Sequence, residues 1–454
     1  MKSRKVSRRR FVSVVTAGSV SVVASGAVPG FVNLTGMQQS AGKLAILGGD
    51  PVRKNKPWHS WPYIDKNVVD SVVKTTNSGK WCRMGVKDST VTTFENEFAS
   101  MLGARFFVGT GSGTQSLNTC VEALEIGAGD EIITSPYSDM GTIASILVCR
   151  ALPVMADLDP ESYQIDPDDV ERRITPNTRA IMPVHIMGVP CNMERIMAIA
   201  KKHNLKVIED SCQAHLAEYQ GKKLGTIGDF GAFSFQETKV ISCGEGGGVV
   251  GNDEIMMERI YTVQNHGTTR NGITERIGPK YRMTEFEGAI LMGQIPGFRE
   301  RHEIRNRNAN YLRSKLKDFP GLVCQKQYAG TTSSAYYKFA WSYHKEHFNN
   351  ADRTKFQKAI AAEGVGLTGY ISRGLHKDPW TEYIMNQKVY QRMYTPARLK
   401  QYRDELNFPN CDNVCRDVLV IPGPGPLLGT LEDMDDIINA IMKVYENRDK
   451  LNTI

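Results

Sequence analysis

The feature that most constrains the fold is an alternation of short β-rich runs with helical stretches between residues 105 and 252. The runs expected to form strands are 105–110, 131–136, 152–158, 179–187, 206–210, 230–235 and 248–251. The stretches expected to form helices lie between them, at 114–124, 140–150, 168–174 and 193–203. Such alternation builds a mostly parallel sheet with helices on both faces. We therefore predict an α/β fold whose ligands bind beyond the carboxyl ends of the strands.

The pattern changes after Tyr281, which suggests a second domain. Pro296 and Gly297 interrupt the chain, and the charged stretch 298–318 that follows predicts a long helix. A further helix is expected at 431–448. A chain of 454 residues is long enough for two or three domains. We predict a large domain over 41–297 and a smaller α+β domain over 298–454.

The net charge of +7 does not indicate a nucleic-acid-binding protein. Six of the 56 basic residues lie within the first ten positions, and no acidic residue precedes Asp50. Without these six, the rest of the chain has 50 basic residues and 49 acidic ones. This leaves no basic footprint of the kind that nucleic-acid binding requires.

The first 40 residues resemble an export signal of the twin-arginine type. The run SRRRFV at 7–12 leads into a moderately apolar stretch at 11–32, with small residues at 25–27 where a peptidase could cleave. A membrane anchor and a disordered basic tail are the alternatives, because the apolar stretch is just long enough to span a bilayer. We expect export, to the periplasm or tethered to the membrane, with a cytoplasmic location as the alternative. Contact with a membrane is expected only through this signal.

The nine cysteines are odd in number and scattered in spacing, which argues against a disulfide framework. Cys411 and Cys415 could share a helix face or a turn, and their redox state after export stays open. No histidine or second cysteine pair completes a zinc site with them, and no metal site is predicted.

Three segments carry residues suited to chemistry. The first, GTGSGT at 109–114, lies between an expected strand and an expected helix, where glycines and helix-start amides can hold a phosphate. Taken alone it is a weak signal, because no lysine follows for a nucleotide P-loop and the dinucleotide pattern fails. A plain glycine-rich turn is an equally good interpretation.

The second segment is VIEDSCQAH at 207–215, in which Asp210 ends a buried strand. A carboxylate there requires a positive partner, such as a protonated ring nitrogen, although capping aspartates at strand ends are common. The third segment is FSFQETK at 233–239, followed by GEGGG at 244–248. A lysine in such a loop can have a lowered pKa, although a single lysine is more often a surface residue. A phosphate cradle, a buried aspartate and a loop lysine together are what pyridoxal phosphate requires of a protein.

The segments SGT, VIEDSCQAH, FSFQETK, GEGGGVV and YRMTEFEGAI resemble, in order and spacing, the DegT/DnrJ/EryC1/StrS family of sugar aminotransferases. The resemblance runs from residue 44 to the C-terminal helix, and the opening LAILGGDPVRKNKPWHSWP looks like the branch of cyclitol aminotransferases and aminohydroxybenzoate synthases. It implies a fold type I enzyme that binds pyridoxal 5'-phosphate and works as a homodimer with active sites at the interface.

The resemblance also implies roles for individual residues. Lys239 is expected to form the Schiff base with the cofactor and to move the proton between substrate and cofactor. Asp210 would pair with the pyridine nitrogen, Gln213 would lie near the phenolic oxygen, and Tyr137 would stack on the ring. The phosphate would be held by Gly113, Thr114 and Ser234.

His185 in the segment PVH is expected only to line the pocket. Two positions depart from the family pattern. The asparagine that reaches the neighbouring subunit's phosphate is Lys280 here, which can still meet a phosphate as a point charge. The glycine after QAH is Leu216, which could crowd the loop beside Gln213.

The expected reaction moves an amino group from an amino acid, glutamate or glutamine, to a keto-sugar or cyclitol ketone. A pyridoxal-phosphate sugar dehydratase of the same family is one alternative, but that branch replaces the Schiff-base lysine with histidine, and Lys239 is intact. A catalytically idle cofactor-binding sensor is the other alternative. The intact Lys239, Asp210 and Gln213 argue against it.

Overall fold

The computed structural model describes residues 42–454, which belong to one compact unit. The export signal predicted within residues 1–40 lies outside the described residues. From residue 42 onward, no helix combines the length and apolar character needed to cross a membrane.

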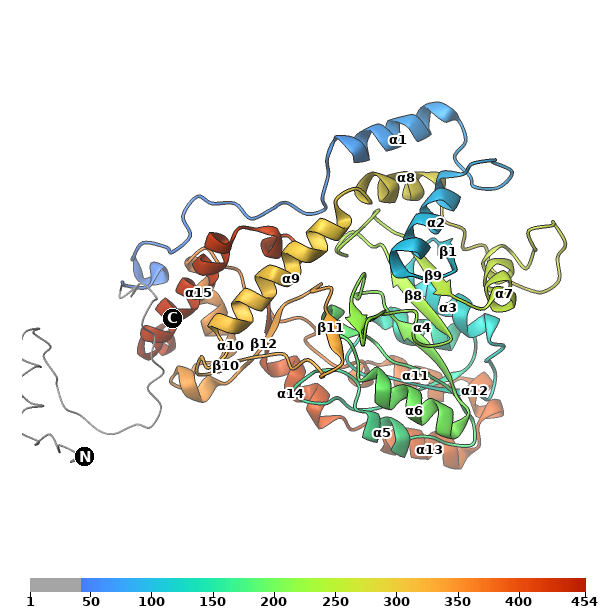
Figure 1. The fold of residues 1–454 in the computed structure, drawn as a ribbon. Helices are drawn as coiled ribbons and strands as arrows, with labels where there is room; N and C mark the ends of the chain where they lie inside the picture. Colours follow the sequence, from blue (N-terminus) through green and yellow to red (C-terminus); the bar gives the residue numbers. More distant parts are fainter. Residues whose placement is uncertain (1–41) are drawn as a thin grey trace, which may run out of the picture. The chain divides into compact units, whose positions relative to one another are not determined.

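The centre of the fold is a seven-stranded sheet in the order β1-β9-β8-β5-β4-β2-β3 (Figure 1). Its strands are β1 (Phe106–Thr110), β2 (Glu131–Thr134), β3 (Leu152–Met155), β4 (Thr178–Met182), β5 (Lys206–Asp210), β8 (Phe230–Ser234) and β9 (Gly247–Gly251). Strand β9 runs antiparallel to both of its neighbours, and the other neighbouring pairs are parallel. The predicted α/β architecture with a mostly parallel sheet is therefore confirmed.

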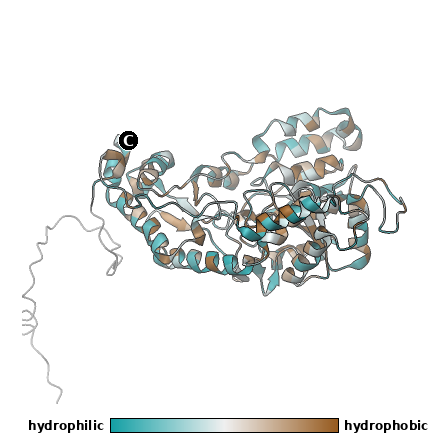
Figure 2. Ribbon diagram, turned by 90° about the horizontal axis from the view of Figure 1, so that it is seen from above, coloured by the Kyte–Doolittle hydropathy of each residue, from teal (hydrophilic) through white to brown (hydrophobic). Residues whose placement is uncertain are grey.

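Both faces of this sheet are buried, because adjacent residues in each strand pack into different clusters. Ile208 and Val249 point to a cluster that includes residues of α3 (Gly113–Ala123) and α7 (Glu254–Gln264). Their neighbours Val207 and Val250 point to clusters on the opposite face. The other helices of this part are α1 (Lys66–Ser78), α2 (Thr90–Leu102), α4 (Met140–Val148), α5 (Pro167–Arg172), α6 (Met193–His203) and α8 (Glu285–Gln294). Hydrophobic and hydrophilic residues alternate along the helices in Figure 2, as expected for helices with one buried face.

The C-terminal part begins with α9 (Phe298–Lys315) and has its own antiparallel sheet, β10-β12-β13 (Leu322–Cys324, Ala340–Tyr343 and Val418–Val420). Helices α10 (Arg353–Ala362), α14 (Pro409–Asp417) and α15 (Leu431–Glu446) belong to the same part. A third small sheet joins β11 (Thr331–Ser333) to β6 (Glu218–Tyr219) and β7 (Lys222–Lys223).

Helices α11 (Trp380–Met385), α12 (Lys388–Met393) and α13 (Pro396–Asp404) pack against the end of the central sheet. The hydroxyls of Tyr390 and Tyr402 donate to the carbonyls of Ala151 and Pro153, at 3.2 and 3.0 Å. Part of the chain assigned to the smaller domain thus covers the larger one, and the boundary at 297/298 stays a prediction.

Residues 42–57, here called the N-terminal strap, are fixed to the C-terminal part. The buried Glu363 carboxylate accepts the Ala45 amide at 2.8 Å and the Lys443 ammonium at 2.7 Å. The Asn447 side chain donates to the Gly42 carbonyl at 3.1 Å. A charged pair buried this fully holds the strap in one register.

The segment after β4 differs from the expectation. The strand ends at Met182 instead of continuing to 187. Pro183 has no amide to extend the ladder, and Met187 has a positive φ of 62° within the short helical turn Ile186–Gly188. The chain therefore turns at the carboxyl end of the sheet, beside the Asp210 loop.

Candidate active site

A cavity of about 450 Å³ lies at the carboxyl ends of β5 and β8. Residues from all three sequence segments line it: Gly113, Thr114, Asp210, Gln213, Ser234 and Lys239. These six predicted site residues therefore come together in one place, although Gly113 and Lys239 are 126 positions apart in the sequence. Further wall residues are Ser138, Asp139, Thr142, Glu245, Tyr337 and Tyr370.

The start of α3 forms one end of this cavity. Ser112 is the N-cap, and its side chain accepts the amide of Gln115 at 3.2 Å. The cap leaves the helix-start amides of Gly113 and Thr114 available to an anion, together with the positive end of the helix dipole. A Cβ atom on Gly113 would lie 2.6 Å from Ser234 Cβ and 2.9 Å from Cys212 Sγ. Glycine at 113 thus keeps a cradle that a side chain would fill.

Asp210 is a buried carboxylate at the end of β5, 4% exposed. One of its oxygens accepts the Thr142 hydroxyl at 2.8 Å, and the other accepts the Cys212 amide at 3.2 Å. Within residues 42–454, no lysine, arginine or histidine forms an ion pair with it. A buried carboxylate with only neutral donors is costly, and a positive ligand group would offset that cost.

Lys239 enters the same cavity from the loop after β8, where its amide donates to the Gln236 carbonyl at 2.8 Å. Its ammonium nitrogen lies 4.5 Å from the centroid of the Tyr337 ring. The Tyr337 hydroxyl is within 2.8 Å of the Thr238 hydroxyl, which fixes the ring beside the lysine.

Gln213 and Tyr370 form a buried polar pair on another side of the cavity. The Gln213 amide group donates to the Tyr370 hydroxyl at 2.9 Å, and its oxygen accepts the Met187 amide at 2.7 Å. Burial raises the pKa of Tyr370 well above its usual value, so the phenol stays neutral. Tyr337 and Tyr370 were missed by sequence reasoning, because they follow no motif and come from the C-terminal part.

Two predicted site residues do not line the cavity. Tyr137 is fully buried, and its ring packs at 6.2 Å from the Tyr370 ring, within a cluster that includes Cys411. Its neighbours Ser138 and Asp139 occupy the wall instead. Lys280 is exposed on the segment between α7 and α8. The roles assigned to Tyr137 and Lys280 stay predictions.

The expectation that His185 lines the pocket is wrong. His185 is fully buried, and its Nδ1 accepts the Cys191 amide at 3.1 Å. This leaves the proton on Nε2, which lies 3.1 Å from the Glu209 carboxylate. Glu209 also accepts backbone amides of the 225–228 turn. His185 and Glu209 therefore have a structural role, because Glu209 fixes the 225–228 turn.

Leu216, where the family has glycine, has a φ of 61° in the left-handed region. This conformation explains the family preference, because only glycine adopts it without a steric cost. The Leu216 side chain is 2% exposed and packs in the core cluster that includes Phe233. Leucine at position 216 therefore has a strained backbone angle, and in return it buries an apolar side chain.

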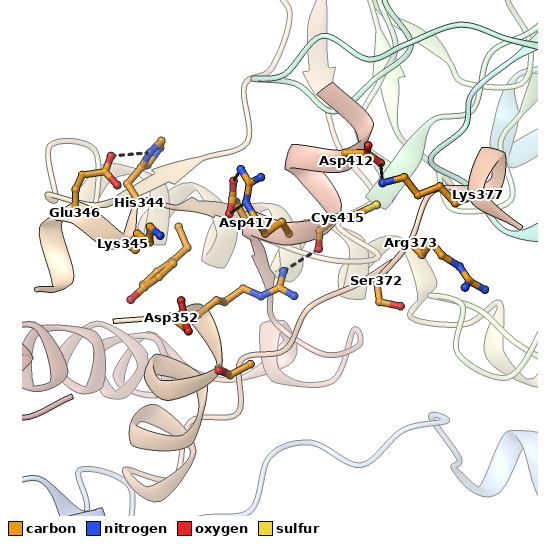
Figure 3. Close-up of a pocket in the computed structure, with 14 residues that line it drawn as sticks. His344, Lys345, Glu346, Asp352, Ser372, Arg373, Lys377, Asp412, Cys415 and Asp417 are labelled. Carbon is orange, nitrogen blue, oxygen red and sulfur yellow. Dashed lines mark hydrogen bonds and ion pairs between the residues drawn. The ribbon is translucent and has the colours of Figure 1, made fainter. Parts of the chain in front are cut away.

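A larger cavity of about 910 Å³ lies among β12, α10 and α14 (Figure 3). Its charges are mostly paired with one another, as in the ion pair of Lys377 with Asp412 at 2.6 Å. Cys411 and Cys415 share α14, both as buried free thiols, and Cys415 lines this cavity. The cavity lacks the buried unpaired carboxylate that distinguishes the site at Asp210.

Residues 62–442 match the DegT/DnrJ/EryC1/StrS aminotransferase family. The chain belongs to this family. An L-glutamine:2-deoxy-scyllo-inosose aminotransferase of Streptoalloteichus tenebrarius is 31% identical over 90% of this chain and 99% of its own length. The Streptomyces fradiae protein of the same name gives the same three values.

Among solved structures, an aminotransferase from Psychrobacter cryohalolentis is 27% identical with a TM-score of 0.75, over 87% of this chain and all of that one. The 3-amino-5-hydroxybenzoic acid synthase structure has a TM-score of 0.74 and 23% identity over the same shares. The prediction of a fold type I, pyridoxal-phosphate-dependent aminotransferase is therefore confirmed.

The residues of this DegT/DnrJ/EryC1/StrS aminotransferase fit the cofactor. The α3 amides and Ser234 suit a phosphate, and the unpaired Asp210 suits a protonated ring nitrogen. Bound pyridoxal phosphate supplies the carbon that carries the amino group and a ring that withdraws electrons. With that group bound, Lys239, which lines the same cavity, would take up the proton at its amine nitrogen and return it. Asp210 would stabilise positive charge at the ring nitrogen, because burial strengthens that interaction.

Proposed function

We propose that this enzyme transfers the amino group of L-glutamine to a cyclitol ketone. The support is the likeness, across nearly the whole chain, to relatives named for glutamine and 2-deoxy-scyllo-inosose. The observation that carries the transamination chemistry is the cavity that Lys239 and an unpaired buried carboxylate, Asp210, both line. A dehydratase is disfavoured because Lys239 is retained within that cavity.

A two-stage experiment tests this proposal. Glutamine added to the purified holoenzyme should bleach the visible absorbance of the bound cofactor, and glutamate serves as the alternative donor. Addition of 2-deoxy-scyllo-inosose should restore the absorbance and yield an aminocyclitol detectable by mass spectrometry. Bleaching by neither donor would contradict the donor assignment. Bleaching without recovery would contradict the cyclitol acceptor and leave keto-sugars to be tried.

We further propose that the enzyme is a homodimer. Helix α1 and the segment before it expose apolar side chains, with Ile64 at 68%, Val69 at 51% and Val73 at 52% exposed. A second copy would cover this face, since contiguous exposed apolar surface usually marks an interface. Sedimentation of the wild type and of a Val69→Asp/Val73→Asp variant tests the proposal. A wild-type protein that sediments as a monomer would contradict it.

We also propose export by the twin-arginine route, on the basis of the SRRRFV run at 7–12. A variant with Arg8→Lys and Arg9→Lys should retain the protein in the cytoplasm, as judged by cell fractionation. Equal distribution of both proteins would point to the cytoplasmic alternative.

A further inference from the structure

A second cavity, of about 430 Å³, lies next to the cofactor cavity and is here called the tryptophan cavity. Trp58 and Trp61 of the N-terminal region line it, together with Lys338, and the segment 421–426 forms another wall. Thr238 lines both cavities, and its hydroxyl lies 2.8 Å from that of Tyr337, which lines the cofactor cavity. The two cavities are therefore adjacent at Thr238.

Lys338 is the charged group of interest in the tryptophan cavity. Its ammonium nitrogen lies 4.9 Å from the Tyr337 ring centroid and 5.8 Å from that of Tyr370. No acidic side chain in the 42–454 range forms an ion pair with it, although the exposed Glu237 lines the same cavity. Burial lowers the pKa of Lys338, Tyr337 opposes the shift, and the charge of Lys239 adds to it. An anionic ligand group would offset both the cost of burying the Lys338 charge and its repulsion from Lys239.

The two lysines share one aromatic ring. Lys239 Nζ lies 4.5 Å from the Tyr337 centroid, about as close as Lys338 Nζ. An amino donor brings its α-carboxylate only one carbon away from the reacting nitrogen. Among the described residues that line the cofactor cavity, Asp139, Asp210 and Glu245 are acidic and Lys239 is the one cationic residue. The expected role of Lys239 in proton transfer leaves it unsuited to hold a carboxylate as well. A donor bound at Lys239 therefore needs a second cation close by.

We propose that Lys338 binds the α-carboxylate of the amino donor, and that the tryptophan cavity receives the part of the donor beyond the reacting carbon. This inference rests on the proposed function, because it assumes an amino-acid donor. A cyclitol ketone carries no carboxylate, so Lys338 acts in the donor half-reaction and not in the acceptor half-reaction.

The first test measures the donor half-reaction of the holoenzyme by the loss of visible absorbance. Lys338→Met should raise the half-saturating glutamine concentration by about 10- to 100-fold, the usual range for a charge-assisted hydrogen bond. Lys338→Arg should recover most of this loss. Lys345→Met is the control, because it removes an exposed charge at the separate cavity of Figure 3. An unchanged glutamine requirement in Lys338→Met would overturn the proposal.

A second substrate makes the assignment specific to the carboxylate. L-glutamine amide, which replaces the α-carboxylate with a neutral carboxamide, should react less well than glutamine with the wild type. Lys338→Met should lose this discrimination, whereas Lys345→Met should keep it. Discrimination that survives in Lys338→Met would assign the carboxylate to another cation, such as one from a second subunit, and would overturn the proposal.

Binding without turnover separates this proposal from the proposed function. Glutarate, a dicarboxylate with no amino group, should quench the tryptophan fluorescence of the holoenzyme because Trp58 and Trp61 line the cavity. The quenching should be saturable in the wild type and at least tenfold weaker in Lys338→Met. If glutamine fails to bleach the wild type, the proposed function fails, and glutarate still decides on Lys338. Absent or equal quenching in the two proteins would overturn the carboxylate site.

Discussion

The hydroxyl of Thr142 donates a 2.8 Å hydrogen bond to the carboxylate of Asp210, so a residue of α4 holds the end of β5 in place. Thr142 in turn lies 2.7 Å from the Ser138 hydroxyl, and all three side chains are buried. The orientation of the Asp210 carboxylate therefore depends on a residue that precedes it by 68 positions.

Removal of this hydroxyl should weaken the site without emptying it. Thr142→Val keeps the side-chain shape and takes away one of the two donors to Asp210. We expect about tenfold weaker pyridoxal-phosphate binding, from the usual cost of leaving one buried hydrogen-bonding group unpaired. The measurement is a titration of the apoprotein followed at the visible band of the bound cofactor. Thr119→Val is the control, since its buried hydroxyl donates to the Gln115 carbonyl instead. Equal affinities in the two variants would contradict the role of Thr142.

Gly113→Ala should block the phosphate cradle. The added Cβ would lie 2.6 Å from Ser234 Cβ, so Ser234 or the start of α3 must shift. We expect a loss of about 1–3 kcal/mol of stability from overpacking, and cofactor binding at least tenfold weaker. Gly127→Ala is the control, because its Cβ would meet only the Cys149 carbonyl, at 3.3 Å. Thermal unfolding and cofactor titration measure both effects, and wild-type values for Gly113→Ala would show that the cradle tolerates a side chain.

At Leu216, glycine should be a more stable replacement than alanine, the reverse of the order expected within a helix. Leu216→Ala leaves a cavity at a buried site, which costs about 2–5 kcal/mol of stability. Alanine also keeps the steric strain of a Cβ atom at a left-handed backbone angle. Leu216→Gly loses the same packing and relieves about 1 kcal/mol of that backbone cost. The glycine variant should therefore be the more stable of the two in urea unfolding. At Leu312, buried within α9, alanine should be the more stable replacement. The same order at both positions would show that Leu216 is not strained.

The protein should lose stability as the pH falls from about 6.5 toward 3. Burial, assisted by the charge of Arg305, lowers the pKa of His302 to about 3, whereas an unfolded histidine titrates near 6.5. Between these values the unfolded chain binds more protons, so acid favours unfolding, by about 1.4 kcal/mol per pH unit for each such histidine. Burial lowers the pKa of His215 to about 3 in the same way. Urea unfolding of His302→Gln should show a shallower pH dependence than the wild type, whereas replacement of the exposed His347 should not.

The parts of the site that depend on local sequence could be predicted. The strand that ends at Asp210, the loop that carries Lys239 and the helix that begins at Gly113 each have their own residue pattern, and all three meet at one edge of the sheet. The same reasoning could not find Tyr337 and Tyr370. Their place in the cavity depends on how the C-terminal part folds back, which no short pattern encodes.

His185 shows the opposite limitation. Its position in the chain placed it correctly near the carboxyl end of the sheet, but position alone does not say which way a side chain points. The hydrogen bond that Nδ1 accepts from the Cys191 amide, and the contact of Nε2 with Glu209, hold the His185 ring in the interior. Leu216 was likewise recognised as a departure from the family, but its backbone angle, which explains the departure, required the structure.

The attachment of the N-terminal strap has a consequence for the order of synthesis. The groups that hold it, Glu363, Lys443 and Asn447, lie more than 300 residues downstream of Ala45, Asp50 and Gly42, to which they bind. A ribosome makes the strap first and its anchors last, so the strap is held only when translation is nearly complete. Any leader joined to residue 42 therefore remains attached to an undocked segment until the last helix has formed, and docking of the strap reports that the chain is finished.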